Sequence, residues 1–113
     1  MIIRKFGIYL ADLNPNFGTE PGKTRPVVVL QTDLLNNEHP STIICPVTSN
    51  VKKDITLLRV HLSGHETGLK KASDILVDQI RAIDNRRFVR QIGTLSAHNQ
   101  EKLVHNIKIV LFE

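Results

Sequence analysis

The sequence has no tryptophan, one tyrosine and one cysteine, and aromatic residues make up only 4% of it. With so few aromatic rings, the chain has little from which to build a stacking platform for several single-stranded bases. Any contact with nucleic acid must therefore rely on arginine, lysine and backbone groups. The lone Cys45 cannot form an intrachain disulfide, and its apolar neighbours favour a buried thiol that fills the core. No apolar run has the length of a signal peptide or a membrane span, so we expect a cytoplasmic protein with no membrane partner.

Histidines and carboxylates show no spacing typical of a metal site. His61 and His65 stand four residues apart, but Ser63 and Gly64 between them break any helix that would bring both onto one face. The HExxH motif is absent as well. We therefore expect neither a metal nor a cofactor.

The composition is that of one small globular domain. The chain has 113 residues, of which 41% are hydrophobic, so residues 1–113 suffice for a single domain with one core. The formal net charge is +4, from 15 Lys and Arg against 11 Asp and Glu. This mild excess favours polyanions or acidic proteins as partners.

Short apolar or alternating segments predict several β-strands. They cover residues 6–13, 26–30, 42–47, 56–62, 72–84 (one or two strands) and 88–95. In the fourth segment Leu58 faces the core, and Arg59 and His61 face the opposite side. Ser96 is a suitable N-cap for one long helix, in which apolar residues recur at spacings of three and four. The pattern predicts a mostly β fold, a strongly curved sheet or small barrel with a C-terminal helix.

A long loop, residues 14–25, precedes the second strand and holds two prolines and two glycines. Long loops of this kind are typically functional. Its Gly22-Lys23-Thr24 segment first suggests a nucleotide-binding P-loop. Only three residues separate Gly18 from Gly22 where a P-loop has four, and a strand follows instead of a helix. The P-loop interpretation is therefore excluded.

Arg25 and Thr48 are the candidates for phosphate chemistry. Arg25 stands between the loop and a buried strand, where its fork can reach a phosphate bidentately, and Thr48 leaves the end of a neighbouring apolar strand. Taken alone, the two residues favour a simpler interpretation, an arginine that ties the loop and a threonine that caps a turn. Glu20 is either a base or orienting group beside Arg25, or half of a loop-stabilising ion pair.

A second basic group follows late in the sequence. It consists of Arg81, Arg86, Arg87 and Arg90. We interpret it as a solvated face, with a track for a polyanion as the alternative.

Taken together, these motifs resemble the MazF/PemK-like toxins of bacterial toxin–antitoxin systems, which are ribosome-independent messenger-RNA endoribonucleases. The segments that carry the resemblance are GIYLADLNP at 7–15, GTE at 18–20, GKTRPVVVL at 22–30, PVTS at 46–49 and DQIRAID at 78–84. The resemblance covers nearly the whole chain.

The resemblance implies a CcdB/PemK-like (SH3-like) small barrel that works as a homodimer and cleaves single-stranded mRNA at specific sequences without a metal. It implies attack by the RNA 2′-hydroxyl, which leaves a 2′,3′-cyclic phosphate and a 5′-hydroxyl. Arg25 and Thr48 match the catalytic pair of the family, and Glu20 is a further catalytic candidate. The residues expected to bind RNA are Lys23, Thr24, Ser49, Asn50, Gln79, Arg81 and Arg86. A cognate acidic antitoxin, similar to MazE, is expected to cover this site.

Two rival functions share the predicted fold. A gyrase-poisoning toxin of the CcdB kind depends on a tryptophan near the C-terminus, and this chain has none. A non-catalytic barrel that only binds nucleic acid or protein is the second rival.

Overall fold

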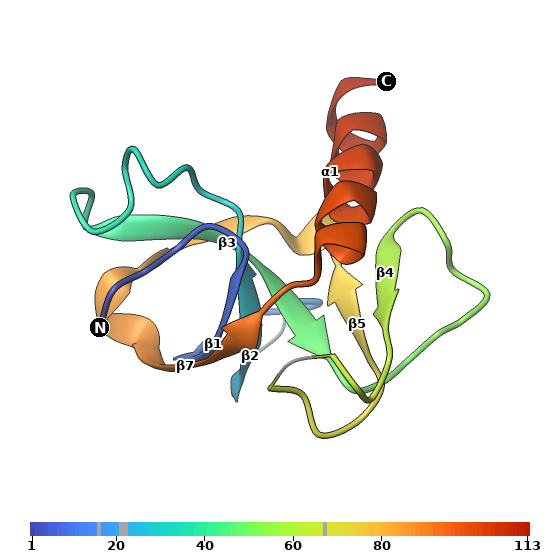
Figure 1. Cartoon of the computed structure of the whole chain (residues 1–113), viewed down its shortest axis with the longest axis horizontal. Helices are drawn as coiled ribbons and strands as arrows, with labels where there is room; N and C mark the ends of the chain where they lie inside the picture. The colour runs from blue at the N-terminus through green and yellow to red at the C-terminus, as the bar shows by residue number, and fades with distance from the viewer. Residues whose placement is uncertain (16, 21–22, 67) are drawn as a thin grey trace.

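Seven antiparallel strands form one strongly curved sheet, which a single helix follows (Figure 1). The computed structural model describes residues 1–15, 17–20, 23–66 and 68–113. The strands are β1 (Gly7–Asp12), β2 (Thr24–Val29), β3 (Ser41–Thr48), β4 (Arg59–Leu62), β5 (Ser73–Leu76), β6 (Arg81–Asp84) and β7 (Phe88–Thr94). Two 3₁₀ turns, η1 (Val77–Gln79) and η2 (Asn85–Arg87), flank β6, and the helix is α1 (Ala97–Phe112). The predicted mostly β fold with a C-terminal helix is confirmed.

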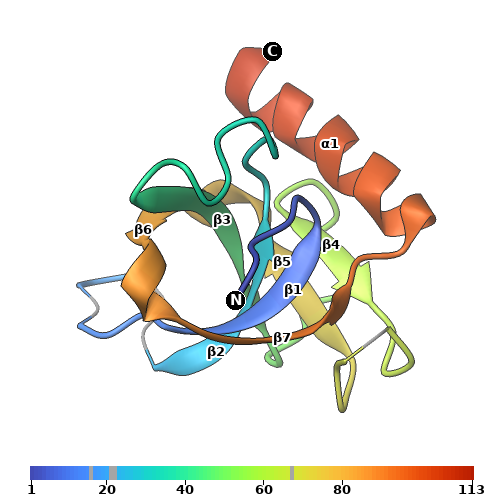
Figure 2. The ribbon, with the colours of Figure 1, turned by 60° about the vertical axis from the view of Figure 1, so that its left-hand side comes forward.

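The strand β3 belongs to both parts of the sheet. One part holds β7, β1, β2, β3 and β6, and the other holds β3, β5 and β4. The sheet order is β4-β5-β3-β2-β1-β7, and β6 pairs with the first half of β3 while β5 pairs with its last two residues. Figure 2 shows β1, β2, β3, β6 and β7 curling around one side of the molecule, with α1 lying across the other side near β4. The C-terminal end of β3 therefore lies where the two parts of the sheet meet.

Buried side chains form two clusters, one on each face of β1 and β2. Val27 packs in one cluster with Tyr9, and Val28 packs in the other with Cys45 and Leu103 of α1. Successive strand residues point to opposite faces, so the apolar run of β2 is buried on both sides, as predicted. The expected single core is wrong, because the curved sheet buries side chains on both of its faces, and α1 adds Leu103 to only one of the two clusters.

Two strands begin elsewhere than predicted. The strand β2 starts at Thr24, because Thr24 and Arg25 already pair with the end of β1, so Arg25 lies within the strand. The strand β4 starts only at Arg59, and Leu58 is exposed instead of facing the core. Arg59 pairs with the last residue of β5, Leu76, beyond which the chain turns into η1 and offers no further partner strand.

Other local predictions agree with the structure. The segment 72–84 holds two strands separated by η1, and the Ser96 side chain accepts a hydrogen bond from the backbone N–H of Asn99 at the start of α1. In α1, the apolar side chains Leu103 and Val110 pack against the sheet, whereas Leu111 is exposed. Within the described ranges, no helix combines the length and the apolar character needed to cross a bilayer.

Candidate active site

A cavity of about 570 Å³ lies at the junction between the two parts of the sheet. Its walls come from β1, from the first residues of β2, from the end of β3, from β7 and from the segment 68–73. The sequence-predicted residues that line it are Lys23, Thr24, Arg25, Thr48, Ser49 and Asn50. Two loops distant in sequence thus meet over one hollow.

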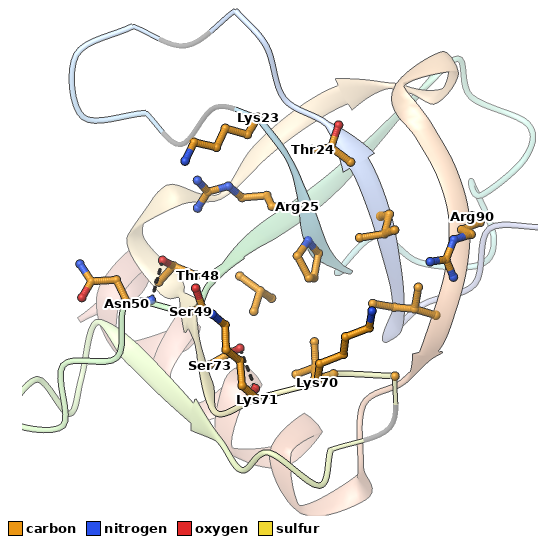
Figure 3. A pocket seen from close by; sticks show the side chains of 16 residues that line it. Lys23, Thr24, Arg25, Thr48, Ser49, Asn50, Lys70, Lys71, Ser73 and Arg90 are labelled. Atoms are coloured by element: carbon orange, nitrogen blue, oxygen red, sulfur yellow. Dashed lines mark hydrogen bonds between the residues drawn. The ribbon is translucent and has the colours of Figure 1, made fainter.

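Arg25 and Thr48 lie on neighbouring strands. The strands β2 and β3 pair in the register Val27 to Pro46, and the same antiparallel register extended by two residues sets Arg25 opposite Thr48. Figure 3 shows both side chains on the same side of the cavity, and Asn50 beside Thr48. The adjacency that sequence alone could not establish is therefore present.

The Thr48 hydroxyl is held by the turn that follows it. Its Oγ accepts a hydrogen bond of 3.1 Å from the backbone N–H of Asn50 (Figure 3). A hydroxyl that accepts one bond still carries a hydrogen to donate. Thr48 thus combines the turn-capping role of the simpler interpretation with a donor suited to a phosphate oxygen.

Arg25 is half-buried in the lining of the cavity. Burial lowers the pKa of its guanidinium below the ordinary value, because desolvation penalises the cation. An arginine pKa starts so far above neutrality that the side chain remains a cation at physiological pH. Its charge is therefore partly shielded from water, and this strengthens its attraction for an anion in the cavity.

Five basic side chains line the cavity, and no acidic side chain stands among its described lining residues. The five are Lys23, Arg25, Lys70, Lys71 and Arg90. Figure 3 shows Lys70 and Arg90 across the cavity from Arg25 and Thr48. Cations on facing walls of one cavity favour an extended polyanion over a single small anion.

Lys70 and Lys71 were missed by sequence reasoning, and Arg90 was assigned to a solvated face. A usable signal existed, because a glycine-containing loop places Lys70 and Lys71 just before β5, as another places Lys23 just before β2.

Gly68 brings its loop close to β7: it has φ of +81°, and a Cβ added there would lie 2.0 Å from the carbonyl oxygen of Ile92. Only glycine fits this approach.

Lys23 takes a left-handed backbone conformation, with φ of 66°. Its N–H donates to the Asn14 side chain at 2.8 Å, and its carbonyl accepts from the N–H of Leu13 at 2.9 Å. Such a conformation costs a non-glycine residue about 1–2 kcal/mol, which these two bonds offset. The end of the predicted long loop is thereby fixed beside the cavity, while residues 16, 21 and 22 of that loop lie outside the described part of the chain.

The structure does not bring four other predicted residues to the cavity lining. Glu20 is exposed and does not line the cavity. Gln79 ends η1, and Arg81 pairs with Ile44 on β3. Arg86 is exposed and makes a two-point ion pair with Asp84, with N···O distances of 3.0 and 2.9 Å. Their roles in catalysis or RNA binding stay predictions.

Cys45 takes no part in the cavity. It is fully buried, and this burial raises the pKa of its thiol to about 12, so the thiol stays protonated and unreactive. The predicted structural role of Cys45 is confirmed. Among the described residues, no three His, Cys, Asp or Glu side chains gather as a metal site would require.

Comparison with known proteins identifies the family and the fold. Residues 4–111 match the family described as PemK-like, MazF-like toxin of type II toxin–antitoxin system. The chain belongs to this family. The curated protein Endoribonuclease EndoA of Bacillus subtilis is 33% identical over 111 residues, which is 98% of this chain and 96% of that protein. The resemblance predicted from the sequence motifs is therefore confirmed.

Solved structures of MazF toxins share the fold. MazF from Deinococcus radiodurans superposes with a TM-score of 0.85 at 24% identity, covering 100% of this chain and 99% of that one. A MazE–MazF structure from the same organism superposes with a TM-score of 0.78 at 24% identity, covering 98% and 97% of the two chains. The curved sheet with its C-terminal helix is therefore the MazF fold.

Proposed function

We propose that this MazF/PemK-family toxin cleaves single-stranded mRNA at specific sequences by attack of a ribose 2′-hydroxyl on the adjacent phosphorus. The observation that carries the proposal is the cavity in which Arg25 and Thr48 lie on neighbouring strands. Five basic side chains, Arg25 among them, line this cavity. Family membership and the relative named as an endoribonuclease support RNA as the substrate. The reaction uses a nucleophile contained in the substrate, so it requires neither an activated water nor a metal.

In the proposed reaction the 2′-oxygen bonds to phosphorus as the bond from phosphorus to the 5′-oxygen breaks. The 2′-proton leaves to a base and the 5′-oxygen gains a proton, which gives a 2′,3′-cyclic phosphate and a 5′-hydroxyl. Negative charge on the non-bridging oxygens rises in the transition state. Arg25 stabilises this charge, and the Thr48 hydroxyl donates to one oxygen and holds the phosphate in line.

Three of the four other basic side chains of the cavity have a binding role across it in this scheme. Figure 3 shows Lys70 and Arg90 across the cavity from Arg25, and Lys71 follows Lys70 in the chain, so these three cations suit phosphates that neighbour the reacting one. Ser49 and Asn50 at the rim offer hydroxyl and amide groups for base edges. We call Arg25 and Thr48 the reacting side of the cavity, and Lys70, Lys71 and Arg90 its holding side.

The test compares cleavage of an RNA of mixed sequence by wild type, Arg25→Ala and Thr48→Ala in the presence of EDTA. Loss of one transition-state donor typically lowers kcat by about 10²–10³-fold, and we expect a loss of this size for each variant. Arg4→Ala and Thr94→Ala are matched controls, because both side chains are exposed and neither lines the cavity. Circular dichroism checks that each variant is folded.

The chemistry of the ends separates this mechanism from hydrolysis. Products should carry a 5′-hydroxyl that polynucleotide kinase labels without prior phosphatase treatment. Products with a 5′-phosphate, a requirement for added metal, or full cleavage by folded Arg25→Ala and Thr48→Ala would each refute the proposal.

The proposed regulator is a cognate acidic antitoxin that covers the cavity of a toxin homodimer. Structural relatives of this chain include MazE–MazF complexes, and the cationic cavity is complementary to an acidic segment. An acidic segment that orders along this groove blocks RNA by occupying the same charges. The antitoxin should therefore compete with RNA, and the competition should weaken when Lys70 and Lys71 are both changed to glutamine.

A further inference from the structure

A buried carboxylate lies one strand away from Thr48, outside the cavity. Asp74 of β5 pairs with Thr48 of β3 on one side and with His61 of β4 on the other. Its side chain is 0% exposed, and it makes ion pairs with Arg59 and His61. Burying a carboxylate costs free energy unless several hydrogen bonds compensate it. The groups that hydrogen-bond to Asp74 are therefore the groups that it holds in position.

Among the described residues, the side-chain hydrogen bonds of this carboxylate go to the segment 49–58 or to the strand β4 that follows it. Asp74 Oδ2 accepts from the backbone N–H of Lys52 at 2.9 Å and from Arg59 at 3.0 Å, and Oδ1 lies 2.7 Å from Nδ1 of His61. The same Arg59 nitrogen donates to the carbonyl of Asn50 at 2.8 Å. We call Asp74, Arg59, His61 and the backbone of Lys52 the Asp74 cluster.

The Asp74 cluster reaches the candidate active site through Asn50. The backbone N–H of Asn50 holds the Thr48 hydroxyl, and its carbonyl is held by Arg59. Asn50 and Ser49 line the cavity themselves. A short chain of hydrogen bonds thus runs from the buried carboxylate through Arg59 and Asn50 to the hydroxyl of Thr48.

His61 makes this arrangement sensitive to protonation. Its Nδ1 faces the Asp74 carboxylate, and its Nε2 lies 2.9 Å from the carbonyl oxygen of Ile55. Both neighbours are acceptors, whereas a neutral imidazole has only one N–H to donate. The ring therefore makes both hydrogen bonds only as an imidazolium, and deprotonation gives up one of its two links.

The charged groups around His61 fit the imidazolium. Asp74 faces it from β5, and Arg59, on the same strand as His61, shares that carboxylate. Burial by itself raises the pKa of Asp74, but hydrogen bonds from the Lys52 backbone, His61 and Arg59 together hold it below its ordinary value. The carboxylate thus remains charged at neutral pH, and both Arg59 and Nδ1 of His61 lie within hydrogen-bond distance of it.

We propose that the Asp74 cluster positions the Thr48–Asn50 rim for RNA cleavage, and that loss of a proton from His61 loosens the rim. This inference rests on the proposed function, since it assigns Asp74, Arg59 and His61 as positioning residues for Thr48. None of the three lines the cavity, so they act on the substrate only through the rim.

The test measures single-turnover cleavage at saturating RNA between pH 5 and 8, the range in which histidines commonly change charge in proteins. Asp74→Asn should lower the rate constant about tenfold to a hundredfold, as expected for a displaced catalytic group, with little change in KM. Asp33→Asn is the matched control, because this exposed carboxylate also accepts a backbone and a side-chain N–H, from Lys5 and Asn36. If Asp74→Asn does not fold, Arg59→Gln takes its place with the same expected loss.

His61→Asn separates positioning from general stability. An asparagine amide near the position of Nδ1 can still donate to Asp74, but it does not titrate. The ratio of wild-type to His61→Asn rate constants should therefore fall as pH rises. In the free protein, the amide NMR shifts of Asn50 and Lys52 should follow the titration of His61 in wild type and stay flat in His61→Asn.

The outcomes distinguish the two proposals. If wild type cuts RNA and depends on Arg25, but Asp74→Asn and Arg59→Gln keep the wild-type rate, the positioning role is wrong and the proposed function stands. A pH-independent rate ratio, or amide shifts that ignore His61, overturns the protonation step. If wild type does not cut RNA at all, the proposed function fails, and the amide shifts alone then decide whether His61 controls the rim.

Discussion

The five basic side chains of the cavity make a quantitative prediction for the salt dependence of RNA binding. For single strands, the logarithm of the binding constant falls with the logarithm of salt concentration with a slope of about −0.7 for each neutralised phosphate. If each of the five cations neutralises one phosphate, the slope is about −3.5. Affinity should then fall about a hundredfold between 50 and 200 mM salt.

The perturbation is the triple variant Lys70→Gln, Lys71→Gln and Arg90→Gln. It removes the cations of the holding side and leaves Lys23 and Arg25. The expected slope is about −1.4, which corresponds to a loss of only about sevenfold over the same salt range. Each single variant should change the slope by about 0.7.

The assay is fluorescence anisotropy with a 2′-O-methyl RNA, which lacks the nucleophile and is not cut. Lys102→Gln on the exposed face of α1 is a charge-matched control. Arg86→Gln is the second comparison, because Asp84 already neutralises Arg86 through two hydrogen bonds and the slope should change by less than about 0.3.

Two results would refute this reasoning. A triple variant whose slope equals that of wild type would mean that RNA does not cross the holding side of the cavity. A loss of about 0.7 in slope for Arg86→Gln would place the RNA on the late arginines that the sequence suggested. Either result would move the RNA path away from the cavity.

Four further predictions concern single positions. Tyr9→Phe removes a buried hydroxyl that accepts one backbone hydrogen bond and donates another, and should lower the free energy of unfolding by about 1–2 kcal/mol in urea denaturation. Glu20→Gln should keep RNA cleavage within about twofold, since Glu20 is exposed and outside the cavity lining, and a loss of about 10²-fold would instead identify it as the base. Gly68→Ala should lower thermal stability and weaken RNA binding, because its Cβ would meet the Ile92 carbonyl. The carboxylate of Asp74 has a pKa below its ordinary value, so its stabilising effect should be lost as pH falls through that lowered pKa, and Asp74→Asn should show a flatter stability profile in acid.

Local patterns in the sequence were sufficient for most of the elements. The apolar runs of β2 and β3 and the capped pattern of α1 depend on interactions between near neighbours, which the sequence displays directly. The ends of strands were less predictable. Leu58 has the periodicity of a strand residue, but β4 begins only at Arg59, because its partner strand β5 ends at Leu76 and the chain there turns into η1.

The candidate site divides in the same way. Arg25 and Thr48 stand out because each lies at the end of an apolar strand and within a motif of a known family. Arg86 was expected to bind RNA only through the family resemblance, and its turn supplies Asp84 as a counter-charge two residues earlier. Lys70 and Arg90 stand twenty positions apart in the sequence, and no local pattern joins them, yet they line one cavity.

The sequence by itself determined the fold class, the family and the two residues proposed for catalysis, because strand periodicity and family motifs are properties of short segments. Only the tertiary structure decided which cations line the cavity and what holds Thr48 in place. The physical reason is that antiparallel pairing sets distant residues opposite one another, as it sets Asp74 between Thr48 and His61. Charges that pairing brings together interact over a few ångströms, whatever their separation along the chain.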